Sequence, residues 1–450
     1  RVLHAQARGP FEYEAYRVKL WVAVEPSPLV APTAASELAT ALTARTDLVF
    51  GAAWQVRGVA APASLSQRIL AGKLPLSSEE IAAVSAATLD EDKLIIIGVR
   101  EADGVCRVVA QEFDCRSRSW SEPTERVALQ PDNLVEAALS AVVEAFSPVV
   151  RIELVEGEKA QTRLRAGGLL TSDESPAALK AGQILQPVLR RNDRYGEAGK
   201  NSIQRLPFTF LQVSQRDGYR VSCDIHSGVR GAIGGRGART EKFALLVRPQ
   251  ERGTRLTLRK RGPSASELVG YEVLTRKINS PAPPVLLGQS NLRGAIQIPL
   301  ATEPIEFIYV RHGQQMLARV PVVPGLLPEQ TISLTDDDPR LAAEGYFVAM
   351  QNSVMDLVAR REVLAARIRA RAEQNQWKEA KEMVPQLRAL PSRAELLRQV
   401  ELQQQRFRSD DKAVQAKVDK MFVELRKLLG KHLDPRLIDE VAAEISAGKQ

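Results

Sequence analysis

The chain has few residues of the kinds that most often carry chemistry. Its 450 residues include three cysteines and four histidines, too few for a disulfide framework or a Cys/His metal ribbon. Aromatic residues make up 5% of the chain, which argues against a surface built to stack nucleic-acid bases. No run approaches the roughly 20 apolar residues of a membrane helix. These scarcities leave ordinary globular modules as the expected architecture.

The charge is only mildly one-sided. Lysine and arginine number 62 against 54 aspartates and glutamates, for a formal charge of +8 and a pI near 9.4. Spread over so long a chain, this excess produces a weak mean field, so a solvated, slightly basic surface is the simpler interpretation. Nucleic acid is therefore an unlikely partner. A basic protein that binds nucleic acid or another polyanion remains an alternative.

The cysteines and the first residue bear on location. Cys106 and Cys115 lie near opposite ends of one predicted strand, about 30 Å apart if the chain is extended, so they should not bridge each other. Cys223 could pair with either, but free buried thiols are favoured. The chain starts at Arg1, which a removed signal peptide or simple trimming would explain. We expect an extracytoplasmic protein of the periplasm or cell surface.

The length favours about three domains, and the pattern predicts a multidomain α+β protein. The expected modules are an αβ domain at 1–148, a small β-barrel at 149–250, a β-sandwich at 251–325 and a helical hairpin or coiled arm at 339–450. The αβ domain centres on 89–146, where an apolar run is followed by two strands and a helix. Strands are predicted at 48–56, 105–113 and 115–127.

The N-terminal pattern is similar to a known domain. Its matching segments are VKLWVAV (18–24), SELATALTAR (36–45), DLVF (47–50) and DKLIIIG (92–98). In this order they resemble the αβ domain shared by the curli secretion channel CsgG, the TolB N-terminal domain and the flagellar assembly protein FlgT. That resemblance implies an envelope protein that oligomerises or docks partners, with no catalytic site that can be mapped onto this chain.

The next module is expected to be a docking barrel. Leu179–Gln183 followed by ILQPVLRR resembles small SH3-like barrels, including the one that follows the αβ domain in FlgT. The glycine-rich stretch 228–237 lacks the spacing of a dinucleotide or P-loop fingerprint. Its backbone could still hold an anion, with Arg230, Arg236 and Arg239 as counter-charges. A surface loop is the favoured alternative.

Residues from about 255 to 325 resemble a transthyretin-like or carboxypeptidase-regulatory-like β-sandwich. The resemblance rests on Leu268–Val273 and on Leu286–Pro299. Ser290-Asn291 stands where family members carry Thr-Asp, which puts a cation-binding version of that turn in doubt. The resemblance implies a structural or carbohydrate-surface module.

Helices are predicted from the acidic cap Asp336–Asp338 onward, the fourth ending before Gly430. In that fourth helix an apolar stripe is expected to contact a second copy or a partner. The stripe consists of Val414, Val418, Phe422, Leu425 and Leu429. Five arginines, at 360, 361, 367, 369 and 371, are interleaved with Glu362 and Glu373, which is typical of a solvated helix face.

A catalytic constellation is not evident. Cys223 and His226 are the one close Cys/His pair, but residues three apart on a strand point to opposite faces. A hydrolase that uses them is a second alternative. The sequence predicts a non-enzymatic scaffold of a cell-envelope assembly, without metal or cofactor. Its expected partners are copies of itself and other envelope proteins, with a membrane surface or cell-wall polymer as further candidates.

Overall fold

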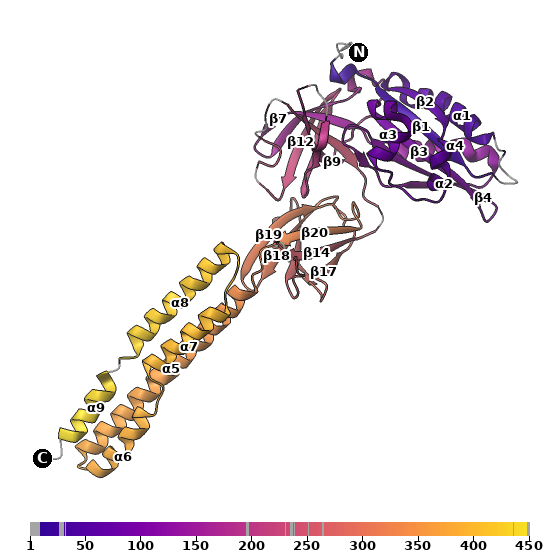
Figure 1. Cartoon of the computed structure of the whole chain (residues 1–450). Helices are drawn as coiled ribbons and strands as arrows, with labels where there is room; N and C mark the ends of the chain where they lie inside the picture. Colours follow the sequence, from indigo (N-terminus) through magenta and orange to yellow (C-terminus); the bar gives the residue numbers. More distant parts are fainter. Residues whose placement is uncertain are drawn as a thin grey trace.

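The computed structural model describes residues 10–26, 31, 33–194, 198–229, 231–234, 237, 239–250, 252–262, 265–434 and 436–447. Three β-containing modules form a body, and a helical arm projects from it (Figure 1). The two ends of the chain lie at opposite ends of the molecule, the C-terminus at the tip of the arm. This architecture confirms the predicted multidomain α+β class.

The N-terminal module is a six-stranded sheet between two layers of helices. Strand β1 runs parallel to β2 and β3, while β4 is antiparallel to β3 and pairs with both β5 and β6. The strands are β1 (Tyr16–Val24), β2 (Trp54–Ala60), β3 (Lys93–Ala102), β4 (Val105–Asp114), β5 (Ser119–Trp120) and β6 (Thr124–Ala128). Helices α1 (Ala34–Phe50) and α4 (Leu134–Ala145) cover one face, and α2 (Ala63–Leu70) and α3 (Ser78–Ser85) pack on the other.

The apolar run of β3 follows from this layering. Ile95 and Ile97 pack toward α1 and α4, while Leu94 and Ile96 pack toward α2 and α3. A strand that is buried on both faces has no polar alternation, so the run is continuous.

Two predicted strands in this module are wrong. The strand expected at 48–56 instead begins at Trp54, because residues 48–50 complete α1 and leave Leu48 exposed. Phe50 then stacks on Trp54 at 3.6 Å between ring centroids. The strand expected at 115–127 is split into β5 and β6. Arg118 adopts a left-handed φ of 52° before β5, and Pro123, which cannot donate to a ladder, separates the two.

The second module is a closed barrel. Strands β9, β11, β12, β8, β7 and β13 follow one another around it, and pairing of β9 with β13 closes the ring. Strand β10 extends the sheet beside β9. The strands are β7 (Val149–Glu156), β8 (Lys159–Leu164), β9 (Ile184–Asn192), β10 (Ala198–Arg205), β11 (Thr209–Asp217), β12 (Arg220–Ser227) and β13 (Thr240–Val247).

The third module is a sandwich of a three-stranded and a four-stranded sheet. Its strands are β14 (Thr254–Lys260), β15 (Glu272–Lys277), β16 (Val285–Gln289), β17 (Ala295–Ile298), β18 (Glu306–His312), β19 (Gln315–Val322) and β20 (Glu329–Leu334). The sheets, in the orders β17-β14-β20 and β16-β15-β18-β19, enclose an aliphatic core. Short 3-10 turns elsewhere are η1 (Phe11–Tyr13), η2 (Gly51–Ala53), η3 (Ala86–Asp90), η4 (Pro131–Asn133) and η5 (Gly167–Leu169).

The arm consists of three helical passes. Its helices are α5 (Asp338–Glu373), α6 (Trp377–Arg388), α7 (Arg393–Arg406), α8 (Lys412–His432) and α9 (Arg436–Ala447). Helix α5 runs outward, α6 and α7 return toward the body, and α8 and α9 run outward again (Figure 1). Gly430 lies inside α8, so the predicted end of that helix there is wrong.

A polar cluster joins the sandwich to the arm. The rings of Tyr271 and His312 stack at 4.1 Å, and the Tyr271 hydroxyl donates to Asp338 (3.1 Å). Asp337 is fully buried and holds the Arg340 guanidinium at 2.7 Å. The side chain of Asp337 therefore binds an arginine and makes no capping hydrogen bond. Asp336 of the same acidic run instead accepts a 3.1 Å hydrogen bond from the Asp338 amide at the start of α5.

Candidate functional site

Two adjoining cavities lie where the N-terminal module, the barrel and the connection into the sandwich meet. Their volumes are about 620 and 1,010 Å³. Both are lined by 119–123, by Arg205 of β10 and by Gln250 and Leu327. We call the two together the inter-module groove. Cavities between modules are common positions for binding sites, because several elements can there contribute side chains to one surface.

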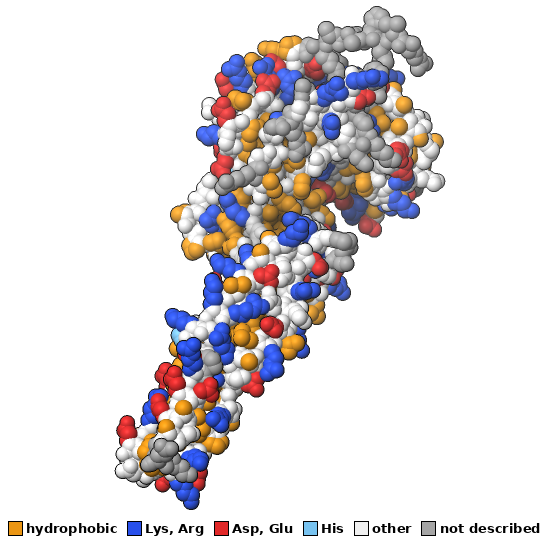
Figure 2. All heavy atoms as spheres, turned by 60° about the vertical axis from the view of Figure 1, so that its left-hand side comes forward, with side chains coloured by type: hydrophobic (Ala, Val, Ile, Leu, Met, Phe, Trp, Pro, Cys, Tyr) orange, Lys and Arg blue, Asp and Glu red, His pale blue; other side chains and the backbone are white. Residues whose placement is uncertain are grey.

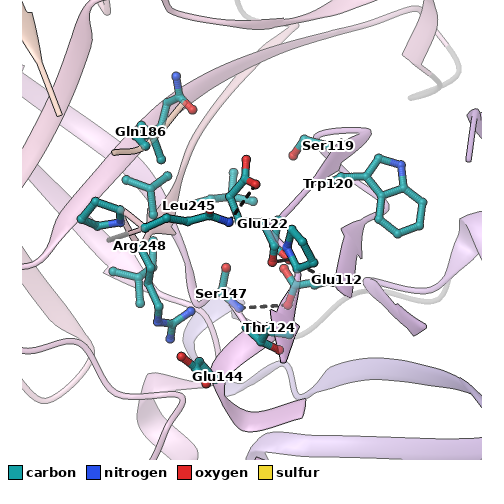
Figure 3. Close-up of a pocket in the computed structure, with 18 of the residues that line it drawn as sticks. Glu112, Ser119, Trp120, Glu122, Thr124, Glu144, Ser147, Gln186, Leu245 and Arg248 are labelled. Atoms are coloured by element: carbon teal, nitrogen blue, oxygen red, sulfur yellow. Dashed lines mark hydrogen bonds between the residues drawn. The ribbon is translucent and has the colours of Figure 1, made fainter. Parts of the chain in front are cut away.

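The smaller cavity is polar (Figure 3). Gln250 donates to the Glu122 carboxylate at 3.1 Å, and burial raises the pKa of Glu122. The Arg248 guanidinium donates to the Phe146 carbonyl at 2.7 Å. Trp120 is fixed beside this cavity by a 2.9 Å hydrogen bond from its indole nitrogen to the Leu76 carbonyl. The Gln250 and Arg248 contacts tie the segment after the barrel to the β5–β6 loop and to the end of α4 in the N-terminal module.

The larger cavity has an apolar floor because the second helix layer is incomplete. Helix α2 packs mainly on β1 and β3, so the same face of β4 is left without a covering helix. Val109 of β4 and Gly98 of β3 line the cavity there. The other apolar lining residues include Leu70, Leu74, Pro75 and Trp120. In this layered fold, a sheet face without a covering helix leaves apolar surface that another element could cover.

Arginines dominate the charged lining of the larger cavity. Among the described residues, five arginines line it against two glutamates. Arg107 pairs with Glu125 at 3.1 Å and Arg100 with Glu25 at 3.5 Å. The other three are Arg118, Arg205 and Arg252, and none has a carboxylate within ion-pair distance among the residues that the structure describes. The groove therefore concentrates positive charge that the chain as a whole carries only thinly.

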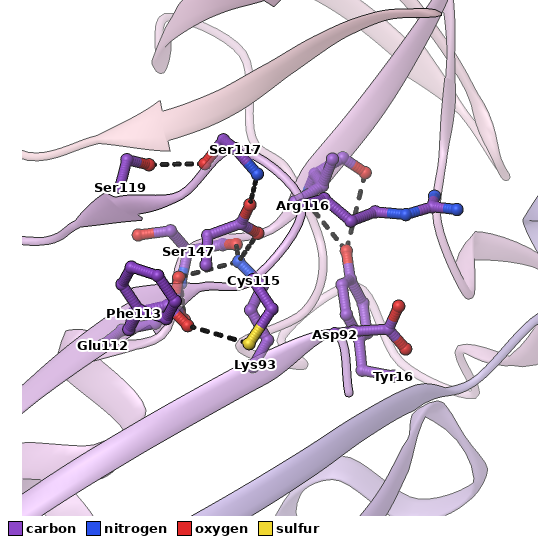
Figure 4. Close-up of polar contacts among 12 residues, drawn as sticks. Tyr16, Asp92, Lys93, Glu112, Phe113, Cys115, Arg116, Ser117, Ser119 and Ser147 are labelled. Atoms are coloured by element: carbon purple, nitrogen blue, oxygen red, sulfur yellow. Dashed lines mark hydrogen bonds and ion pairs between the residues drawn. The ribbon is translucent and has the colours of Figure 1, made fainter. Parts of the chain in front are cut away.

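A buried charge cluster holds β4 beneath the groove (Figure 4). Lys93 Nζ donates to Glu112 Oε1 and to the Ser147 carbonyl, both at 2.7 Å, and lies 2.9 Å from Asp114 Oδ2. All three charged side chains are at most 3% exposed. Glu112 also accepts from the Ser147 amide at 2.9 Å.

The protonation of this cluster follows from its geometry. Burial alone would lower the pKa of Lys93, but the Asp114 and Glu112 carboxylates outweigh it and raise that pKa above its usual value. The same burial raises the pKa of Tyr16, whose ring lies close by, to about 12. Lys93 is therefore a cation that joins strands rather than a nucleophile. Sequence reasoning missed it, since nothing local marks this lysine as buried.

The structure separates Cys223 from His226. Cys223 points into the barrel core, and burial raises its pKa to about 12. His226 lies on the other face of β12, with Nε2 3.3 Å from Gln212 Oε1. A nucleophilic thiol needs its base within hydrogen-bond reach. This pair does not have that arrangement.

We expect all three thiols to be unreactive in the folded protein. Cys106, Cys115 and Cys223 are free and buried, and burial raises the pKa of each. At pH 8 each thiol therefore stays protonated, and only a thiolate attacks a disulfide reagent. Ellman's reagent should detect almost no thiol in native protein and three per chain in guanidinium chloride. Rapid labelling of Cys223 in native protein would contradict this expectation.

The predicted anion site falls largely outside the described structure. Arg230 and Arg236 belong to residues that are not described. Arg239 is exposed immediately before β13. The structure thus does not test whether these three arginines act together.

The predicted contact stripe of α8 lies inside the arm. Its five residues pack against Met350, Val354 and Leu357 of α5 and against Leu396 and Val400 of α7. All five are 5% exposed or less. They form the core of the arm, so they present no surface to a partner in this structure.

Among the described residues, no group of three or more His, Cys, Asp or Glu side chains is placed to hold a metal ion. Within the same residues, every helix is too short or too polar to cross a bilayer.

Comparisons with known proteins yield only distant neighbours. No protein-family model and no curated protein matches the chain. Lipoprotein GNA1162 of Neisseria meningitidis is 18% identical over 28% of this chain and 94% of its own, at a TM-score of 0.16. TolB of Acinetobacter baumannii is 10% identical over 72% and 96%, at 0.19. BcpA, the major pilin subunit of Bacillus cereus, is 10% identical over 54% and 71%, at 0.13. Scores this low do not show a shared overall fold, so the function is argued from the chain's own residues.

Proposed function

We propose that this protein is a non-enzymatic scaffold of an extracytoplasmic, cell-envelope assembly, acting by self-association and by docking other proteins. The observation that carries the proposal is the arm. Helix α5 alone has 36 residues, about 54 Å at 1.5 Å per residue. It extends away from a body of three β-containing modules (Figure 1). Such a shape holds two binding surfaces apart.

The sequence resemblances support the envelope setting of this proposal. The N-terminal segments resemble domains of envelope proteins that oligomerise or dock partners. The body and arm of this chain suit the same work, because each has its own apolar core. The cysteine and histidine that might have served a hydrolase lie on opposite faces of one strand.

The outward face of α5 is the proposed surface for self-association. Val348, Met355 and Val363 are each about half exposed, and their spacings of seven and eight residues place them on one side of the helix. The core residues Val354 and Leu357 are on the opposite side. Charged side chains of both signs surround separate hydrophobic patches along the arm (Figure 2). A helix with two apolar faces can pack within its own chain and against another copy.

Removing residues 341–450 should abolish self-association while the body stays folded. The body should survive because its cores do not include arm residues. Size-exclusion chromatography with light scattering should give several subunits for the full chain and one for the truncated chain. An equal subunit count for both would contradict the proposal.

A triple variant separates the outward face from the fold of the arm. Replacing Val348, Met355 and Val363 with glutamate should reduce the subunit count but keep the helical circular dichroism. The matched control places three glutamates at exposed polar positions on other helices of the arm, Gln386 of α6 and Gln399 and Gln405 of α7. Dissociation by the control to the same extent would show that added charge, not the apolar face, is responsible.

A further inference from the structure

We infer that the larger cavity of the inter-module groove binds an acidic amphipathic segment of a partner protein. This inference rests on the proposed docking role and names the class of partner that the body would hold. The segment would lay apolar side chains on the floor at Gly98 and Val109 and direct carboxylates to the surrounding arginines.

The floor requires an apolar surface on the partner. Val109 is half-buried and projects from β4 on the face that lacks a covering helix. In an αβ sandwich such a face is normally covered by an amphipathic helix. A volume of about 1,010 Å³ suits several side chains rather than one small ion. Helix-in-groove binding uses this geometry, with apolar anchors at helical spacing.

The arginines around the apolar floor, which form the rim of the larger cavity, require a partner with negative charge. Arg118 and Arg252 are exposed at the groove and have no carboxylate within ion-pair distance among the described residues. Arg205 donates to the Trp120 carbonyl at 3.3 Å. The lining carries a formal excess of three positive charges. Complementary carboxylates would be attracted to this rim and would set the orientation of the segment.

Nucleic acid matches this groove less well than a peptide does. A nucleic-acid channel combines cations with several aromatic platforms for stacked bases. Of the described residues that line this cavity, Trp120 alone is aromatic, and its indole nitrogen already donates to the Leu76 carbonyl. The apolar floor would gain no favourable contact from the polar sugars and phosphates of a nucleic acid.

Fluorescence anisotropy with labelled probes tests the inference on the full chain. The main probe is a peptide of about 18 residues, five helical turns, with leucine at helical spacing and glutamate elsewhere. Companion probes replace leucine with serine, replace glutamate with lysine, or are an oligothymidine of equal length. We expect the leucine/glutamate peptide to bind at least about tenfold more tightly than each companion. It alone offers both apolar side chains to the floor and carboxylates to the surrounding arginines.

Substitutions in the larger cavity test whether the peptide binds there. The double change Arg118→Glu and Arg252→Glu should weaken binding at least about tenfold, because two attractions become repulsions. Val109→Glu should do the same through the floor. The matched control, Arg293→Glu with Arg388→Glu, makes the same charge change at exposed positions of the sandwich and of α6 and should leave binding unchanged. Circular dichroism checks that each variant is folded.

Three results would overturn the inference. They are no binding of the leucine/glutamate peptide at high micromolar protein, equal binding of the serine peptide or oligothymidine, and equal affinity for the groove and control variants. None of them affects the arm, so self-association could stand while this inference fails. Conversely, a monomeric full chain that binds the peptide would contradict the self-association proposal alone.

Discussion

Replacing Lys93 with methionine should destabilise the N-terminal module by about 3–5 kcal/mol, the cost of breaking a buried ion pair. The change leaves Glu112 and Asp114 buried without their shared cation, and the Ser147 carbonyl loses its 2.7 Å donor. Urea unfolding followed by tryptophan fluorescence would report it, because three of the four tryptophans lie in this module.

The control for Lys93→Met is a variant in which every charge of the cluster is removed. Lys93→Met combined with Glu112→Gln and Asp114→Asn removes the uncompensated charges and should recover much of the lost stability. Lys277→Met, at an exposed position on β15, should change stability by no more than about 0.5 kcal/mol. If Lys93→Met were as stable as Lys277→Met, the cluster would not be buried as described.

Phe422→Ala should destabilise the arm by about 3–5 kcal/mol, the usual cost of removing a buried phenylalanine ring. Phe422 is 1% exposed, and its ring lies 6.0 Å from that of Tyr346 and 6.2 Å from that of Phe407. It therefore links α8 to α5 and to the residue that follows α7. Thermal unfolding followed by circular dichroism at 222 nm should show an earlier helical transition.

The control for Phe422→Ala is a substitution at the next residue, which lies on the exposed side of the same helix. Val423 is 45% exposed, so Val423→Ala should shift the transition little. Tryptophan fluorescence of the N-terminal module should be unaffected by Phe422→Ala, because that module has a separate core. Simultaneous loss of both signals would show that body and arm unfold as one unit.

Local features of the sequence mark where several helices begin. The Ser77–Glu80 capping box begins α3 with both reciprocal hydrogen bonds, and the side chain of Asp411 caps α8 by accepting from Ala413 and Val414. These features act within one turn of helix, so they are visible in the order of residues. Where competing signals overlapped, the prediction was wrong: LVF at 48–50 has strand propensity, yet it completes α1.

The candidate site had no comparable signal. The groove takes lining from segments as distant as Leu70, Val109, Arg205 and Leu327, and no local pattern brings these together. The same holds for the stripe of α8. Its apolar spacing was evident, but whether it meets another copy or its own chain depends on how the three passes of the arm fold back.

The sequence by itself determined the multidomain α+β class and many of the apolar faces of its helices and strands, because periodicity is a short-range property. Only the tertiary structure decided what each face contacts. Lys93 shows the reason: it looks like an ordinary charged residue at the start of a strand. The hairpin register pairs it with Asp114 and places Glu112 beside it, and that register depends on the whole module rather than on neighbouring residues.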